Sequence, residues 1–320
     1  MIRPERGGEL AKIIFDGDYG IDDALATLFL LGRDDVELVA VGTVHGNAPA
    51  DAAAANALQV LDVAGRRDIP VAVGAQRPLA QPLDISALVH GEDGLGGHAS
   101  PVPELRPEPV SAAEQLVRIA RELPGECTVV ATGPLTNLAL ALLLEPRLPE
   151  LVRNVVVMGG TTREPGNIGP FAEANIWHDP EAAALVLGAG WPLTLVGLDV
   201  TMRTWLDQSD VDRIAAAPGR KAEFAHAILQ HYLRFYRGRH SRPGCPLHDP
   251  SAAVLAVRPD LARCEKAPVR VELRGEHTRG MLVVDRREFA EPDGPLIDVA
   301  AEIDRDRLVA EFLAGLLELV

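Results

Sequence analysis

The chain has 320 residues, of which 47% are hydrophobic, so it can bury a large core in one α/β domain or in two smaller ones. Its 31 basic and 46 acidic residues give a net charge of −15, which argues against the basic face that nucleic acids and anionic membranes require. The three cysteines, Cys127, Cys245 and Cys264, show neither metal-ligand spacing nor a disulfide framework. We interpret them as buried or incidental thiols.

Residues 1–10 form a polar N-terminal extension that lacks the apolar core of a secretory signal. Elsewhere, the apolar stretch 138–144 is broken by Glu145 and Pro146, and none reaches the length of a membrane span. We therefore expect a soluble, cytoplasmic protein with neither a membrane nor a nucleic-acid partner.

Short apolar runs typical of buried strands alternate with helical patterns through the first two-thirds of the chain. The predicted strands cover residues 12–15, 36–44, 71–73, 128–131, 155–158 and 193–198. The predicted helices cover residues 22–31, 50–64, 111–123, 136–144 and 180–187. This alternation predicts an α/β fold with a mostly parallel central sheet that helices cover on both faces.

Four carboxylates, Asp16, Asp18, Asp22 and Asp23, lie between the first predicted strand and the first predicted helix. A solvated acidic loop with a helix N-cap is the simplest structural explanation, but such loops seldom end a buried strand. Buried carboxylates repel one another and resist desolvation unless a positive group offsets them. The pattern therefore favours a divalent metal site, with Gly20 turning the chain so that Asp22 and Asp23 begin the helix.

Polar residues also follow the later predicted strands, among them Asn47, Thr132 and Asp199. In parallel sheets ligands bind beyond the carboxyl ends of the strands, so these residues are expected to converge on one rim. The glycine-rich segment 90–98 is predicted to form a mobile lid over that rim, with His90 and His98 exposed. A second loop is predicted over residues 237–246, after a helix that carries Tyr236.

Residues 16–23 have the form Asp-x-Asp-x-Gly-x-Asp-Asp, and together with later segments they resemble the inosine-uridine-preferring nucleoside hydrolases. The later segments that carry the resemblance are residues 131–139, 157–160, 166–180, 248–250 and 278–281. The resemblance implies one catalytic domain over residues 11–320, with the Rossmann-like nucleoside hydrolase fold. It also implies a ribonucleoside substrate, which is cleaved to ribose and free base, and a homodimer or homotetramer.

By this resemblance the cofactor is Ca²⁺, held by Asp18, Asp23, Asp249 and the backbone carbonyl of Thr132. An all-oxygen ligand set suits this hard cation, which also leaves room for a water and ribose hydroxyls. The metal would lower the pKa of the water, and Asp18 would remove its proton as general base. Asp16 would support the ligands from behind.

The resemblance further assigns residues to the substrate. Asp22 and Asn175 would hold the 2′- and 3′-hydroxyls, with Asp249 also near the 3′-hydroxyl, and Asn167 and Glu173 would hold the 5′-hydroxyl. It also places Met158 against the sugar, with Asn47 beside it. Apart from the resemblance, His90 in the lid and Tyr236 and His240 on the preceding helix and loop are candidates to contact the base. His248 would protonate the leaving base, because an imidazole titrates near neutral pH, and Tyr236 and His240 are alternatives for that role.

The chain departs from the family pattern at Gly17, Tyr19 and Trp177, and we expect Tyr19 and Trp177 to reshape the pocket around the base or the 5′ end. Two other functions stay open. A haloacid dehalogenase-type phosphatase would use Asp16 as nucleophile and Asp18 as acid with magnesium. A non-catalytic, metal-dependent riboside-binding protein would need no general acid.

Overall fold

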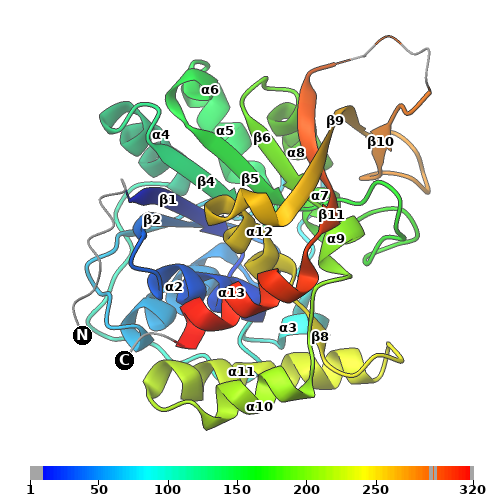
Figure 1. Ribbon diagram of the computed structural model, residues 1–320. Coiled ribbons are helices and arrows are strands. Elements are labelled where there is room, and N and C mark those ends of the chain that lie inside the picture. The colour runs from blue at the N-terminus through cyan, green and yellow to red at the C-terminus, as the bar shows by residue number, and fades with distance from the viewer. Residues whose placement is uncertain (1–9, 288–290, 292–293, 318–320) are drawn as a thin grey trace.

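The computed structural model describes residues 10–287, 291 and 294–317, so almost all of the expected N-terminal extension lies outside the described residues. Within that part of the chain, a nine-stranded sheet has the strand order β10-β9-β11-β6-β5-β4-β1-β2-β3 (Figure 1). The strands of this sheet are β1 (Ala11–Gly17), β2 (Val36–Thr43), β3 (Val71–Val73), β4 (Cys127–Ala131), β5 (Asn154–Met158), β6 (Leu193–Val196), β9 (Ala262–Val271), β10 (Leu282–Val284) and β11 (Leu296–Ile303). Two short strands, β7 (Trp205–Leu206) and β8 (Cys245–Pro246), pair separately.

The helices are α1 (Ile21–Leu31), α2 (Ala50–Val63), α3 (Ala87–His90), α4 (Ala112–Glu122), α5 (Thr136–Leu144), α6 (Leu148–Leu151), α7 (Ala174–His178), α8 (Pro180–Leu187), α9 (Leu198–Thr201), α10 (Gln208–Ala216), α11 (Arg220–Arg237), α12 (His248–Val257) and α13 (Arg305–Leu317). A single 3-10 turn, η1, covers Pro259–Leu261. From β3 to β11 neighbouring strands run parallel, whereas β9 and β10 extend the sheet in antiparallel fashion. The predicted α/β fold with a mostly parallel sheet is confirmed.

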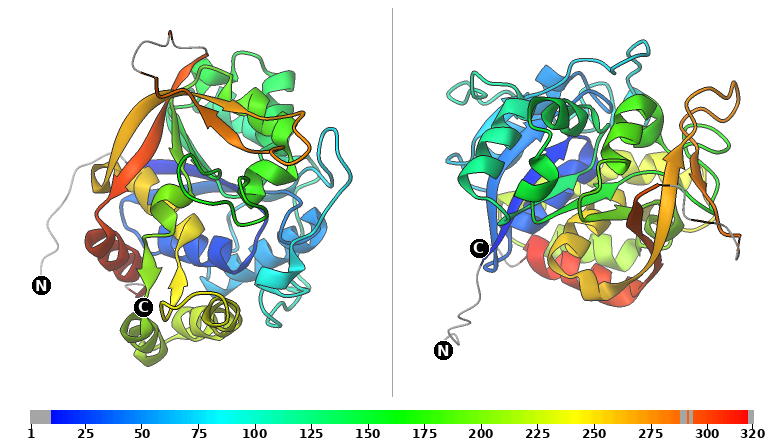
Figure 2. Two further views of the ribbon diagram at one scale, coloured as in Figure 1. Left: turned by 90° about the vertical axis from the view of Figure 1, so that its right-hand side faces the viewer. Right: turned by 90° about the horizontal axis from the view of Figure 1, so that it is seen from above.

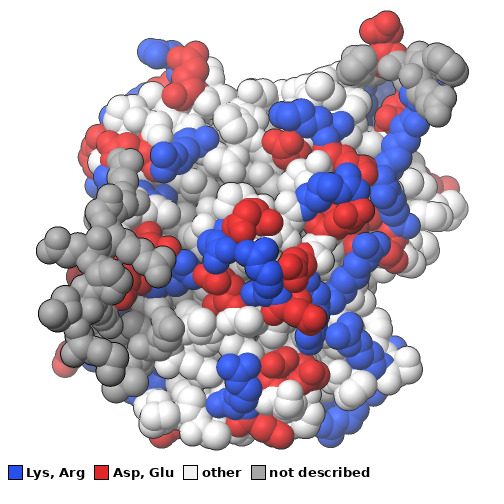
Figure 3. Space-filling view, in the orientation of Figure 1, with Lys and Arg blue, Asp and Glu red and all other residues white. Residues whose placement is uncertain are grey.

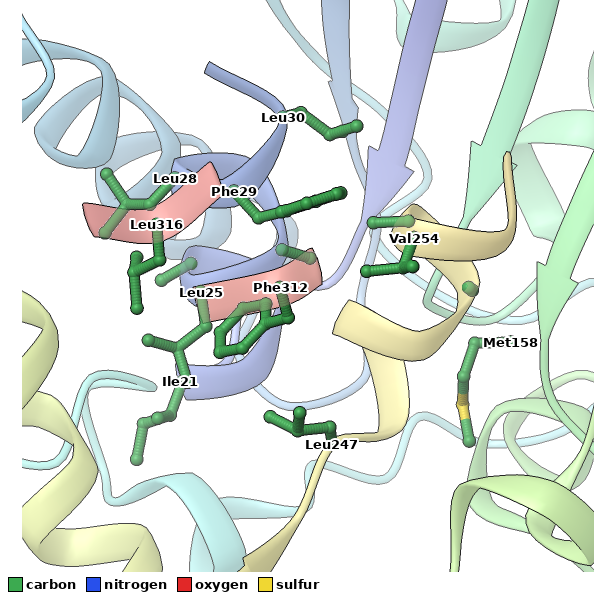
Figure 4. Packing of buried hydrophobic residues seen from close by; sticks show 14 of the residues in the cluster. Ile21, Leu25, Leu28, Phe29, Leu30, Met158, Leu247, Val254, Phe312 and Leu316 are labelled. Carbon is green, nitrogen blue, oxygen red and sulfur yellow. The ribbon is translucent and has the colours of Figure 1, made fainter. Parts of the chain in front are cut away.

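Side-chain alternation along the strands builds two cores, one on each face of the sheet. On β1, Ile13 and Phe15 join the core under α1, α2, α11, α12 and α13, while Ile14 joins the core under α4, α5 and α8. Figure 2 shows the sheet between these two layers of helices. In the first core, Phe29 of α1 packs against Phe312 of α13, with ring centroids 6.1 Å apart (Figure 4).

Two parts of the fold differ from the sequence-based prediction. The strand predicted to end at residue 198 stops at Val196, because the chain turns at Gly197 into α9, where the Leu198 amide donates to the Gly160 carbonyl. The strands β9, β10 and β11 were not predicted. β9 contains Pro268 and several charged residues, a composition that suits an exposed part of a sheet better than a buried central strand.

Acidic and basic side chains are interspersed on the face shown in Figure 3, and many of them are paired. Glu311 of α13, for example, accepts from both Arg33 and Arg258. No helix among the described residues is both long and apolar enough to cross a membrane.

Candidate active site

A cavity of about 660 Å³ opens beyond the carboxyl ends of the central strands. Its walls include most of the residues that the sequence assigned to the site, whereas Asp18 and Asp23 are buried and do not line it. The residues that line it are Asp22, Asn47, His90, Thr132, Met158, Asn167, Glu173, Asn175, Tyr236, His240, His248 and Asp249. They come from segments far apart in the chain, and the order of the strands in the sheet brings them together.

The turn from β1 to α1 places the first carboxylates. Among the described non-glycine residues, only Tyr19 has a left-handed backbone conformation, with φ of 42°. The turn is therefore made at Tyr19 and not at Gly20. Gly20 is needed for space, because a Cβ there would lie 2.6 Å from both Asn47 Nδ2 and His90 Nδ1. The Gly20 amide donates to Asp23 Oδ2 at 2.8 Å, and this bond fixes the first turn of α1.

Three carboxylates, from Asp22, Asp23 and Asp249, have oxygens within 4.8 Å of one another, and all three residues are buried. Asp22 Oδ1 has no hydrogen-bond partner among the described residues, although it is buried. Asp18 lies beside Asp23, but its two oxygens accept from the amide and the side chain of Asn47, each at 2.8 Å. The three carboxylates that lie closest together are therefore those of Asp22, Asp23 and Asp249. The sequence predicted Asp18 in this group and assigned Asp22 to a ribose hydroxyl.

Burial raises the pKa of the Asp18, Asp23 and Asp249 carboxyls, and the neighbouring negative charges raise it further. The pKa of Asp23 rises to about 7, first through burial and then through the charge of Asp22. The pKa values of Asp18 and Asp249 are raised for the same reasons. All donors are oxygens and one of them is buried without a partner, so the cluster fits a hard divalent cation that would hold these groups ionised.

One end of the cavity presents amide and carboxylate groups suited to sugar hydroxyls. Asn175 Nδ2 donates to the carbonyls of Thr132 and Met158, both at 3.0 Å, which leaves its side-chain oxygen as the acceptor it can offer. Glu173 caps α7, accepting from the Asn175 amide at 2.9 Å, and also accepts from the Gly160 amide at 2.7 Å. Burial raises the pKa of this glutamate.

The other end is aromatic. Tyr232 and Tyr236 are one helical turn apart on α11, with ring centroids 4.9 Å apart. The Tyr236 hydroxyl lies 3.1 Å from His248 Nε2, and Thr201 Oγ1 lies 2.8 Å from His248 Nδ1. Burial lowers the pKa of His248 to about 4, so this imidazole is neutral at pH 7, contrary to the near-neutral titration expected from sequence.

His90 does not lie in an exposed lid, as the sequence had suggested. It is buried, its Nδ1 accepts from the Ile21 amide at 3.0 Å, and it lies 3.7 Å from Asp22 Oδ1. Residues 84–90, which end at His90, form part of the cavity wall, whereas the rest of the glycine-rich stretch does not line it. That stretch is folded around Asp93, whose carboxylate accepts from the amides of Leu95, Gly97 and Ala99. His98 is exposed, as expected.

The sequence model of the family described as inosine-uridine preferring nucleoside hydrolase matches residues 13–310. The chain belongs to this family. It is 38% identical to the probable uridine nucleosidase 2 of Arabidopsis thaliana, over 97% of this chain and 99% of that protein. It is 42% identical to the pyrimidine-specific ribonucleoside hydrolase RihA of Shewanella woodyi, over 86% of this chain and 88% of the relative.

Solved structures agree with the family membership. A plant nucleoside hydrolase, the PpNRh1 enzyme, superimposes with a TM-score of 0.92 at 33% identity, covering 96% of this chain and 99% of the other. The purine-preferring ribonucleoside hydrolase from Gardnerella vaginalis gives a TM-score of 0.91 at 30% identity, covering 96% and 98% of the two chains. The chain is thus an N-glycosidase of the ribonucleoside hydrolase type.

Membership in the nucleoside hydrolase family and the position of Asp16 both disfavour the phosphatase alternative. Asp16 does not line the cavity, and its carboxylate accepts from Asn137 Nδ2 at 2.9 Å. Burial raises its pKa to about 7. A nucleophilic aspartate must reach its substrate, whereas Asp16 lies behind the site, where its backbone carbonyl accepts from the Thr132 amide at 2.8 Å.

Tyr19 and Trp177, which we expected to reshape the pocket around the base or the 5′ end, do not line the cavity of this nucleoside hydrolase. Tyr19 is fully buried beneath the site, where its hydroxyl lies 3.1 Å from Thr27 Oγ1, and it is not part of the cavity wall. Trp177 is also outside the wall and packs against Gly280. Tyr232, which was not predicted as a site residue, donates from its hydroxyl to Asp22 Oδ2 at 3.1 Å. Its spacing of four residues from Tyr236 on a predicted helix could have indicated that the two tyrosines lie on the same face.

Proposed function

We propose that the protein is a calcium-dependent hydrolase that cleaves the N-glycosidic bond of ribonucleosides to give ribose and free base. The observation that carries this proposal is the cavity itself, where a buried carboxylate cluster, an amide-rich end and an aromatic end meet. These three parts match the three needs of the reaction: a cation site, a grip on ribose hydroxyls and a place for a planar base.

The cation would be held by Asp18, Asp23, Asp249 and the backbone carbonyl of Thr132, with Asp22 beside it. Calcium, when bound, would lower the pKa of a water molecule that it coordinates. Asp18 is the general base in this proposal. Its support is its place beside Asp23, in the group of buried carboxylates that the cation would hold ionised and so able to accept a proton.

The ribose would lie over Asn175, Asp22 and Met158, with its 5′-hydroxyl toward Glu173 and Asn167. Cleavage develops positive charge on the sugar, as in an oxocarbenium ion. Carboxylate and amide oxygens fixed around the ribose stabilise that charge without rearranging, which makes them worth more than water at the same positions. Asn47, whose amide and side chain donate to both oxygens of Asp18, also lines the cavity and would lie beside the sugar.

The departing base would receive its proton through His248 and Tyr236. Because His248 is neutral at pH 7, it carries a single N–H and can donate only in one direction at a time. Its contacts to Thr201 Oγ1 and to the Tyr236 hydroxyl form a continuous chain of exchangeable protons. His90 and His240 complete the wall around the base.

A pyrimidine nucleoside, with uridine as the first choice, is the substrate that we propose. The support is that the curated relatives at 38% and 42% identity are named as a uridine nucleosidase and a pyrimidine-specific hydrolase. The test is release of reducing sugar from uridine, cytidine, inosine and adenosine by the calcium-loaded protein. Faster hydrolysis of uridine than of inosine is expected, and the reverse order would contradict this preference.

The homodimer or homotetramer implied by the resemblance and the cytoplasmic location both stay predictions. Light scattering coupled to size-exclusion chromatography measures the first, with about two or four chains of 34.2 kDa expected per particle.

A further inference from the structure

Asp199 lies on α9, directly after β6, and is 4% exposed. Its carboxylate accepts from three consecutive backbone amides of another segment. These bonds join Asp199 to Thr162 at 2.8 Å, to Arg163 at 2.7 Å and to Glu164 at 3.3 Å. Such charge-assisted bonds compensate the burial of the carboxylate, and they also select one conformation of the segment that donates them.

The segment that Asp199 holds forms one wall of the cavity. Residues 164–168 line it, and Asn167 is among them. Residues 159–173, all of which the structure describes, contain no helix or strand apart from an isolated bridge at Ala172. The position of this wall therefore depends on a few point contacts, and Asp199 makes three of them.

The contact between α9 and the segment is close on both sides. The Leu198 amide donates to the Gly160 carbonyl at 2.9 Å, and a Cβ built on Gly197 would lie 2.8 Å from that carbonyl oxygen and 3.1 Å from Asp199 Oδ2. Arg203, just beyond α9, reaches Glu164 at 3.4 Å. The base of the segment is thus fixed to α9, while its far end carries Asn167, whose Oδ1 accepts from the Ala174 amide at 2.9 Å.

We propose that Asp199 is a positioning residue for the 5′ end of the ribose, acting through the 161–168 segment and not by touching the substrate. The proposal rests on the proposed function, which assigns Asn167 and Glu173 to the 5′-hydroxyl. It predicts that loss of Asp199 weakens selection for that hydroxyl while the cation site, whose carboxylates come from other elements, keeps its geometry.

The experiment compares uridine with 5′-deoxyuridine in the full-length calcium-loaded protein and in its Asp199→Asn variant. The variant should lower kcat/KM for uridine about tenfold, mostly through KM, because it weakens bonds from backbone amides to a charged acceptor. For 5′-deoxyuridine the change should stay within about twofold, since the group that the segment selects is missing. Asp207→Asn is the matched control, because Asp207 also accepts from backbone amides at a helix start, those of Ser209 and Asp210, but lies outside the cavity wall.

Equal losses on both substrates would overturn the proposal and leave Asp199 a purely structural residue. No loss of kcat/KM on either substrate in the Asp199→Asn variant, or wild-type hydrolysis of 5′-deoxyuridine as fast as that of uridine, would also overturn the proposal while the proposed function stands. Wild-type protein that cleaves no riboside would instead overturn the proposed function and this inference with it. Asp199→Glu, which keeps the charge but displaces it, gives the same comparison if the asparagine variant does not fold.

Discussion

Replacement of Asp23 by asparagine should stabilise the calcium-free protein at pH 8. In the structure, burial and the charge of Asp22 raise the pKa of Asp23 from 3.8 to about 7. A tenfold change in a dissociation constant corresponds to about 1.4 kcal/mol, so keeping Asp23 ionised at pH 8 costs the calcium-free fold about 4 kcal/mol. Asparagine keeps the shape, but its Nδ2 cannot accept one of the two bonds that Asp23 receives from the Gly20 amide and the Thr132 hydroxyl, and the buried donor left without a partner costs about 2 kcal/mol. The expected net gain is about 2 kcal/mol.

The sign of this effect depends on pH. Because the pKa of Asp23 is higher in the folded protein than in the unfolded chain, its contribution to stability is fully present below about pH 4 and is lost as the pH rises through about 7. The advantage of the Asp23→Asn variant should therefore disappear by pH 5. With calcium bound the order reverses at pH 8, because the cation stabilises the wild type and loses a ligand in the variant.

Urea unfolding in EDTA at pH 5 and pH 8 measures these differences in the free energy of unfolding. Asp68→Asn serves as the control, because the pKa of Asp68 is lowered by Arg66 and its replacement should bring no gain at pH 8. The reasoning fails if calcium-free Asp23→Asn protein is less stable than wild type at pH 8, or if the difference is the same at both pH values.

Three further substitutions test separate parts of the site. Tyr236→Phe removes the hydroxyl that contacts His248 and should lower kcat for uridine at least about tenfold with little change in KM; an unchanged kcat in steady-state assays would exclude this proton path. Asn175→Ala should lower kcat/KM for uridine about tenfold or more, because a hydroxyl acceptor is lost, and activity equal to wild type would remove Asn175 from the sugar site. Tyr19→Phe should cost about 1 kcal/mol of stability through its lost contact to Thr27 but leave the ratio of uridine to inosine hydrolysis within about twofold; an altered ratio would restore Tyr19 to the base pocket.

The need of the acidic segment for a counter-charge could be predicted from sequence, because it depends on residues that are neighbours in the chain. Four carboxylates between a strand and a helix need a counter-charge in almost any α/β fold, and the structure indeed buries Asp18, Asp22 and Asp23 together. The polar residues that follow the strands, such as Asn47 and Thr132, were placed on one rim by the general geometry of parallel sheets.

The errors concern side chains whose surroundings come from distant parts of the chain. His90 lies in a stretch that reads locally as a loose glycine-rich loop, yet its ring is held by the amide of Ile21, 69 positions away. The pKa of His248 is set by burial within the assembled site, which no local pattern encodes. Asp199 likewise stood out only as a polar residue after a strand, and its bonds to Thr162 and Arg163 appear only when β5 and β6 lie side by side.

The central claim, that a cation held by buried carboxylates enables riboside hydrolysis, is tested most directly by one assay. Protein stripped of metal with EDTA is incubated with uridine, first without added metal and then with calcium, and ribose release is followed as reducing sugar. The account predicts almost no ribose from the stripped protein and restoration of turnover by calcium, with Asp18→Ala inactive under both conditions. Full activity of the stripped protein, or no ribose from uridine, cytidine, inosine or adenosine after calcium is added, would contradict it.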